Sequence, residues 1–322
     1  MTLLAVSPLP PLGGGQLLST TFNAIPVLLI VGALGLYLWG VQRVNRLRPR
    51  HPWSSRKTAA FIGGLFTTAI SVFSFIGVYQ QELFWDHMVQ HLLLIMVAAP
   101  LFAISSPIDL FWRASTGTLH ARFTALLRSG PSRLLGHPGV AFVAYAVLIP
   151  ITHLTVWYNY TLEHPAIDNV EHLIFLGLGY MFWRQIFGSD PNCYRLHPAL
   201  KFGYLFLAIP IDTFTGLSLD QQTHELFPAY LNFHRTWGPS LVADLHIGGV
   251  LMWVAGDTLM LWPMIPVALS WMHLEERKAV RVDRQLDAAD EADAAELARF
   301  LTGPAGLAGP AGLAGPNDPI EL

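Results

Sequence analysis

The chain has 322 residues, of which 52% are hydrophobic and only 13% are charged, and its mean hydropathy is +0.43. A soluble domain carries about a quarter charged residues, so this composition predicts a polytopic membrane protein. The 19 Lys and Arg residues and 22 Asp and Glu residues give a net charge of -3, which excludes a globally basic surface for nucleic acid. The single cysteine, Cys193, excludes an intramolecular disulfide, a CxxC copper-carrier motif and a zinc ribbon.

Seven apolar segments are long enough to cross a bilayer, which takes roughly 20 residues for about 30 Å of hydrocarbon. In chain order they are Phe22–Val41, Thr58–Val78, Phe84–Ile104, Gly139–Trp157, Val170–Phe187, Lys201–Asp220 and Leu241–Met272. They predict an all-α protein with seven transmembrane helices. The last segment is long enough to tilt or to leave the bilayer after Pro263 and Pro266.

Lys and Arg residues gather on one side of these segments, as the positive-inside rule requires of cytoplasmic loops. They follow the first, third, fifth and seventh segments, whereas the alternate loops contain only Arg235. The pattern predicts an N-terminus outside, a C-terminus inside and an odd number of helices.

Three regions follow from this topology. Residues 1–21 lack the basic stretch of a cleavable signal peptide and are expected to form a short extracytoplasmic tail. Residues 22–272 are expected to form the seven-helix membrane domain. Residues 273–322 are expected to be cytoplasmic, with a charged segment followed by a disordered Gly/Pro/Ala tail.

Five of the thirteen histidines lie within predicted helices near the outer side, on four different helices: His87, His91, His153, His172 and His246. His87 and His91 are four residues apart, so their imidazoles lie on one helix face, about 6 Å apart along the axis. Imidazoles in such a group suit Cu(II) or Zn, and the neighbouring Met88 suits Cu(I). Hydrogen bonding between helices, without any metal, accounts for the same histidines equally well.

Carboxylates accompany these histidines in or beside the predicted helices: Asp86, Asp168, Glu171, Asp212, Asp244 and Asp257. Asp168 precedes His172 by four residues and can orient its ring, whereas Glu171 points about 100° away toward a neighbouring helix. Ionisable groups inside a membrane are costly and usually functional, yet the sequence assigns no role to Asp212 and Asp257.

Three sequence blocks carry a resemblance to a known family. HMVQHLLLIMVAAPLFAISSP (residues 87–107) has two histidines, a Leu-rich run and two prolines seven residues apart. THLTVWYNYTLEHPAIDNVEHLIFLGLGYMFWRQIFG (152–188) has a His near a Trp and then a Glu-His pair that opens a helix. FPAYLNFHRTWGPSLVADLHIGGVLMWVAGD (227–257) has a Tyr/Trp-Gly loop followed by an Asp and a Gly-rich helix. Together they resemble the CtaG-like assembly factors of caa-type cytochrome c oxidase.

The resemblance implies a multi-pass protein of the bacterial cell membrane that assembles a haem–copper oxidase without being an enzyme. It implies that the protein handles or delivers copper, with an oxidase subunit as its membrane partner, an external copper donor, surrounding lipid and no nucleic acid. The expected copper ligands are His87, His91, His153 and His172, with His246 as a possible fifth. Asp168, Glu171 and Asp244 are expected to support these ligands through hydrogen bonds.

Three other functions stay open. A zinc-dependent intramembrane hydrolase would use three histidines to hold Zn and a carboxylate to deprotonate a bound water. A haem module would use facing histidines as axial ligands. A metal-free scaffold would bind an oxidase subunit through its helices alone. The one His-Glu pair, at His224, lacks the second histidine of an HExxH motif, so a zincin-type protease is not supported.

Overall fold

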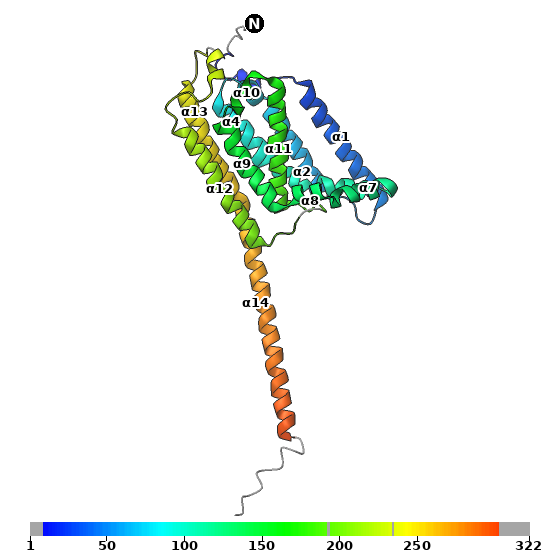
Figure 1. The fold of residues 1–322 in the computed structure, drawn as a ribbon. Coiled ribbons are helices and arrows are strands. Elements are labelled where there is room, and N and C mark those ends of the chain that lie inside the picture. The colour runs from blue at the N-terminus through cyan, green and yellow to red at the C-terminus, as the bar shows by residue number, and fades with distance from the viewer. Residues whose placement is uncertain (1–8, 192–193, 234, 303–322) are drawn as a thin grey trace, which may run out of the picture. The chain divides into compact units, whose positions relative to one another are not determined.

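The computed structural model describes residues 9–191, 194–233 and 235–302, and Cys193 and the expected Gly/Pro/Ala tail lie outside these ranges. The described residues confirm the all-helical prediction, with 82% in helices and none in strands. The helices are η1 (Gln16–Leu18), α1 (Ala24–Leu47), α2 (Ser55–Phe73), α3 (Phe75–Tyr79), α4 (Phe84–Leu92), η2 (Leu93–Ala98), α5 (Ala99–Ser105), α6 (Pro107–Ala114), α7 (Gly117–Arg128), α8 (Gly130–Gly136), α9 (Pro138–Leu154), α10 (Trp157–Glu163), α11 (Pro165–Phe187), α12 (Pro198–Asp220), η3 (Pro228–Phe233), α13 (Leu241–Val250), η4 (Leu251–Ala255) and α14 (Gly256–Thr302) (Figure 1).

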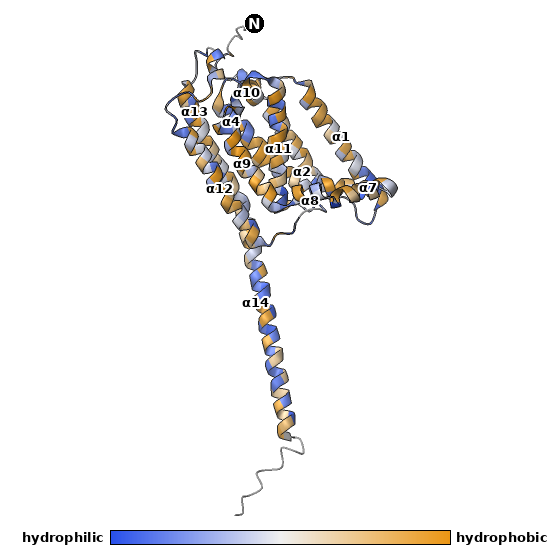
Figure 2. Ribbon diagram, in the orientation of Figure 1, coloured by the Kyte–Doolittle hydropathy of each residue, from blue (hydrophilic) through white to orange (hydrophobic). Residues whose placement is uncertain are grey.

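Contacts divide the chain into two units, residues 1–268 and residues 269–322. The first unit contains α1 to α13 and the beginning of α14. Figure 2 shows that hydrophobic residues dominate its helices, whereas hydrophilic and hydrophobic residues alternate along the part of α14 in the second unit. In that second unit almost all described side chains are exposed.

Five helices in the described part of the chain are long and apolar enough to cross a membrane, namely Ala24–Leu47, Ser55–Tyr79, Phe84–Ala114, Pro198–Asp220 and Leu241–Leu301. A sixth is added if α8 and α9, which meet at a bend of 66°, form one span. The predicted count of seven and the predicted orientation are therefore not confirmed.

The difference lies in α11, which contains the predicted span Val170–Phe187 and is not among these five or six. Polar residues account for its lower hydropathy, because Glu171, Arg184 and Gln185 interrupt the apolar sequence. All three are buried against neighbouring helices. A helix inside a bundle can carry polar residues toward its protein neighbours, so hydropathy alone does not identify it.

Local sequence sets where the helices around the centre begin. Pro138, Pro165 and Pro198 are the first residues of α9, α11 and α12, where the missing N–H of proline costs no hydrogen bond. His137 and His197 precede two of these prolines, and each accepts a hydrogen bond from a backbone N–H of the first turn. These two histidines are therefore helix caps.

The segment from α4 through η2 to α5 lies at the centre of the first unit, where it packs against α2, α11 and α13. Its η2 and α5 parts are almost entirely apolar, as expected for a helix that is surrounded by others, whereas α4 carries Asp86, His87, Gln90 and His91. Its middle, Leu93–Ala98, is a π-helical turn, and η4 is a second one. π-turns are rare and occur frequently at functional sites.

Candidate functional site

Three of the predicted histidines lie together in the bundle. His87 and His91 project from α4, and His153 lies in the last turn of α9. The ring centroid of His153 lies 4.7 Å from that of His91 and 6.0 Å from that of His87. The three side chains are at most 2% exposed. We refer to His87, His91 and His153 as the histidine cluster.

Aromatic side chains enclose the histidine cluster. Phe175 from α11 stacks on His153 with an interplanar angle of 16° and lies 4.8 Å from His91. Tyr158 from α10 lies 4.3 Å from His87. Helices α9, α10 and α11 pack against one another at this point (Figure 1). These rings separate the imidazoles from the surroundings of the bundle.

Hydrogen bonds fix which nitrogen carries the proton in two of the rings. Nδ1 of His153 lies 2.9 Å from the carbonyl oxygen of Ile149, which can only accept, so Nδ1 carries the hydrogen. Nδ1 of His87 lies 3.4 Å from Oε1 of Gln80, whose amide nitrogen donates to the carboxylate of Asp168. In both neutral rings, Nε2 therefore keeps its lone pair.

The lone pairs of the histidine cluster have no partners. Nε2 of His87, Nε2 of His153 and both ring nitrogens of His91 are buried without a hydrogen bond. A buried polar group without a partner costs about 1–3 kcal/mol, so it is rare in folded proteins. Several at one place leave nitrogen lone pairs that a ligand could use.

The histidine cluster lacks the geometry of a finished metal site. No group of three or more His, Cys, Asp or Glu in the described ranges is placed to hold a metal ion. Imidazole nitrogens bind Zn at about 2.0–2.1 Å, so the three rings would have to turn or approach to share one ion.

The other two predicted ligands have partners outside the cluster. Nε2 of His172 lies 2.9 Å from Oε1 of Gln90 and 3.6 Å from Asp168. Nε2 of His246 lies 2.7 Å from the carbonyl oxygen of Gln222, to which it donates. Neither ring makes a ring contact with the cluster within the described part of the chain.

Two of the predicted supporting carboxylates lie beside the cluster and one acts on its helix. Asp168 accepts from Gln80, the partner of His87, and Glu171 accepts from the indole of Trp157 at 2.9 Å. Asp244 accepts from the backbone N–H groups of Phe84 and Trp85, each at 3.1 Å. It therefore holds the first turn of α4 rather than a histidine ring.

Some partners carry no signal in the sequence. Gln80 and Gln90 are ordinary amides that only the packing brings to His87 and His172. By contrast, the sequence did single out Asp86, which is fully buried, and neither of its carboxylate oxygens has a hydrogen bond.

The two carboxylates without an assigned role have hydroxyl partners. The Tyr145 hydroxyl lies 2.8 and 2.7 Å from the two carboxylate oxygens of Asp212. Thr213 donates to Asp257 at 2.7 Å. Their hydrogen bonds connect α9 with α12 and α12 with α14.

Comparison with known proteins gives one family. The model of the family described as cytochrome c oxidase caa3 assembly factor matches residues 35–273, which contain the histidine cluster. Uncharacterised proteins of Mycobacterium leprae and Mycobacterium bovis are 26% identical to the chain over 260 and 279 residues, which is 78% and 82% of this chain. The chain spans only 39% and 42% of these two relatives. No solved structure matches significantly.

Proposed function

Because this chain belongs to the family of caa3 cytochrome c oxidase assembly factors, we propose that it carries copper for the oxidase in the histidine cluster. In this proposal copper is a cargo that the protein passes on, and the protein is not an enzyme. An oxidase subunit in the membrane would receive the ion, and a donor outside the bundle would supply it. Several helices able to span a membrane, together with the family, are consistent with a multi-pass membrane protein.

The unpaired nitrogens of His87, His91 and His153 support this proposal most directly. Neutral imidazoles with free lone pairs are the form that binds copper or zinc. Gln80 and the Ile149 carbonyl oxygen hold two of the rings in that form. Outer partners of this kind raise the affinity of a ligating histidine.

An incomplete site suits delivery better than a closed one. A cargo ion must leave by exchanging one ligand for another, which requires an open position. The cation also needs charge compensation inside the bundle. Asp168, which is linked to His87 through the side chain of Gln80, would offset part of the charge.

The test is a titration of the purified full chain with Cu(I), Cu(II) and Zn, each in competition with a chromophoric chelator. We expect one copper ion per chain in the wild type and a large loss of copper affinity in His153→Phe, which keeps a ring against Phe175. His246→Phe is the matched control, because His246 has its partner outside the cluster, and it should bind copper like the wild type.

Other outcomes point to other functions. Stoichiometric zinc without copper would favour the intramembrane hydrolase. No metal on a folded wild type would overturn copper handling and favour a scaffold that binds an oxidase subunit through its helices.

A further inference from the structure

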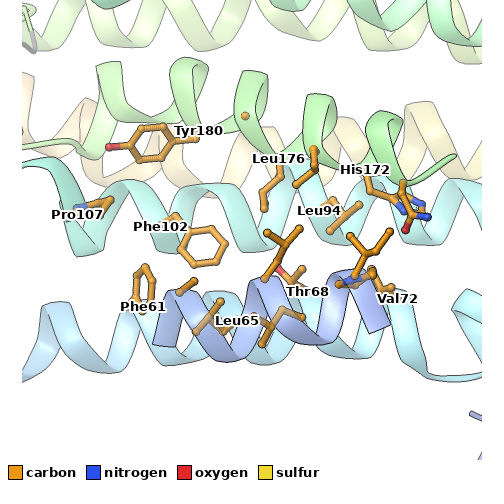
Figure 3. A pocket seen from close by; sticks show the side chains of 18 residues that line it. Phe61, Leu65, Thr68, Val72, Leu94, Phe102, Pro107, His172, Leu176 and Tyr180 are labelled. Atoms are coloured by element: carbon orange, nitrogen blue, oxygen red, sulfur yellow. The ribbon is translucent and has the colours of Figure 1, made fainter. Parts of the chain in front are cut away.

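A groove of about 460 Å³ lies between α1, α2, α5 and α11 (Figure 3). It exists because α1 is buried only at Tyr37, Gly40 and Val44, in its second half. In the first half of α1, Leu28 and Val31 are among the exposed large apolar side chains. None of the residues that line the groove belongs to the histidine cluster, so the groove is a separate site.

The lining of the groove is mostly apolar and contains no charged side chain. Its residues include no Lys, Arg, Asp or Glu. Thr68 donates to the carbonyl oxygen of Gly64, Asn169 donates to that of Pro165, and Tyr180 donates to Asp190. These polar side chains already have partners inside the protein, so they do not require a ligand.

His172 differs from them because its second ring nitrogen has no partner. The amide nitrogen of Gln90 donates to the Ser71 carbonyl oxygen, which leaves Oε1 of Gln90 to accept from Nε2 of His172. Nδ1 of the neutral ring is then a free acceptor, and it is buried without a hydrogen bond in a side chain only 10% exposed. A buried acceptor of this kind is stabilised when a donor reaches it.

The groove has one polar end and a long apolar body. Figure 3 shows His172 at one end and Tyr180 at the other, with Phe102, Leu176 and Leu94 between them. Eight residues of α11 separate the two ends, which corresponds to about 12 Å along the helix. The volume falls in the range of small-molecule pockets, which is about 300–1,000 Å³.

We propose that this groove binds a neutral, lipid-soluble molecule with one apolar tail and a hydroxyl head, whose hydroxyl donates to Nδ1 of His172. An anionic phosphate head group is disfavoured because no basic side chain lines the groove. A head without a donor would leave Nδ1 unsatisfied. Binding in this groove does not involve copper. The proposal can therefore be tested whether or not the histidine cluster binds metal.

Two matched probes test whether the hydroxyl of the ligand contributes to binding. The first is 4-octylphenol, and the second is 4-octylanisole, its methyl ether, which has nearly the same shape but no donor. Equilibrium dialysis against the full chain in nanodiscs, with empty nanodiscs subtracted, measures both affinities. We expect about one phenol per chain, bound about tenfold more tightly than the ether, as one hydrogen bond allows. Equal affinities of the wild-type chain for the phenol and the ether would overturn the proposal. No binding of either probe would also overturn it, so this test requires no variant.

Variants locate the site. His172→Phe should lower the affinity for the phenol to that for the ether and leave the ether unchanged. Gly177→Phe should abolish binding of both probes, because Gly177 lines the groove and a side chain there meets only open space. Gly203→Phe is the matched control, since that glycine also has open space and does not line the groove. Binding that survives Gly177→Phe would place the probe elsewhere and refute the assignment.

Copper titration of the groove variant separates the two proposals. Gly177→Phe should keep the copper stoichiometry of the wild type. Loss of the phenol with copper retained supports a distinct groove, whereas joint loss in Gly177→Phe would contradict the independence of the two sites.

Discussion

The imidazole of His153 stacks on the ring of Phe175, with ring centroids 5.9 Å apart and an interplanar angle of 16°. This contact joins α9 to α11 and holds the face of His153, whereas its two ring nitrogens lie at the edge of the ring. Nδ1 at that edge is bound to the Ile149 carbonyl oxygen, and Nε2 has no partner. The packing thus fixes the ring without using the nitrogen that a cargo ion would need.

Gln80→Leu should weaken copper binding while the fold is retained. The change removes the acceptor of the Nδ1 hydrogen of His87, and loss of such a partner typically lowers metal affinity by about 10–100-fold. Gln222→Leu is the control, because the Gln222 contact with His246 is made by its backbone oxygen. Competition titration gives both affinities, and equal values for the two variants would show that Gln80 does not support the site.

Asp244→Ala should destabilise the protein by about 3 kcal/mol, because removing one partner of a buried ion pair leaves the other charge uncompensated. Arg235 is that partner, at 3.3 Å, and both side chains are at most 4% exposed. The change also removes the acceptor for two N–H groups at the start of α4. Chemical unfolding in detergent measures the loss, and Asp283→Ala on the exposed part of α14 should leave stability unchanged. A loss below about 1 kcal/mol would show that water or another group replaces the pair.

Gly216→Ala should destabilise the packing of α12 against α13 and η4. A methyl group at this position would lie 2.7 Å from the Gly249 carbonyl oxygen and 2.8 Å from Cβ of Trp253, so the helices must separate. Overpacking of this kind costs about 1–3 kcal/mol. Gly203→Ala on the same helix meets no atom within 4 Å and serves as the control. Equal melting temperatures for the two variants would contradict the close approach.

Asp190→Asn should become more stable relative to the wild type as the pH rises. Burial raises the pKa of Asp190 above its ordinary value of 3.8, against the opposing effect of hydrogen bonds from Tyr180 and the Asp109 N–H. The folded state therefore binds more protons than the unfolded state. The stability contributed by this carboxyl is complete below pH 3.8 and is lost as the pH rises through the raised pKa.

The measurement is the difference in unfolding free energy between Asp190→Asn and the wild type at several pH values from about 4 to 7. Pro191→Ala, which keeps the carboxyl, should instead follow the pH dependence of the wild type. A constant difference between Asp190→Asn and the wild type would show that Asp190 does not titrate in this range.

The amino-acid sequence determined the helical class, the presence of helices apolar and long enough to cross a membrane, and the family. These properties depend on composition, on the length of apolar segments and on local motifs, all of which can be recognised within short stretches of the sequence. The four-residue spacing of His87 and His91 also determined that both lie on one helix face, since helical geometry relates them directly. That His153 belongs with them was a prediction from its expected depth in the membrane.

Only the tertiary structure decided which of the five histidines meet. His172 and His246 lie on helices like the others, but the rotation of α11 and α13 about their axes directs them to Gln90 and to the Gln222 backbone. Helix rotation is set by packing with neighbours, so local spacing does not reveal it. The polar residues of α11 have the same origin, because side chains such as Glu171 are buried against other helices and only their partners make that placement favourable.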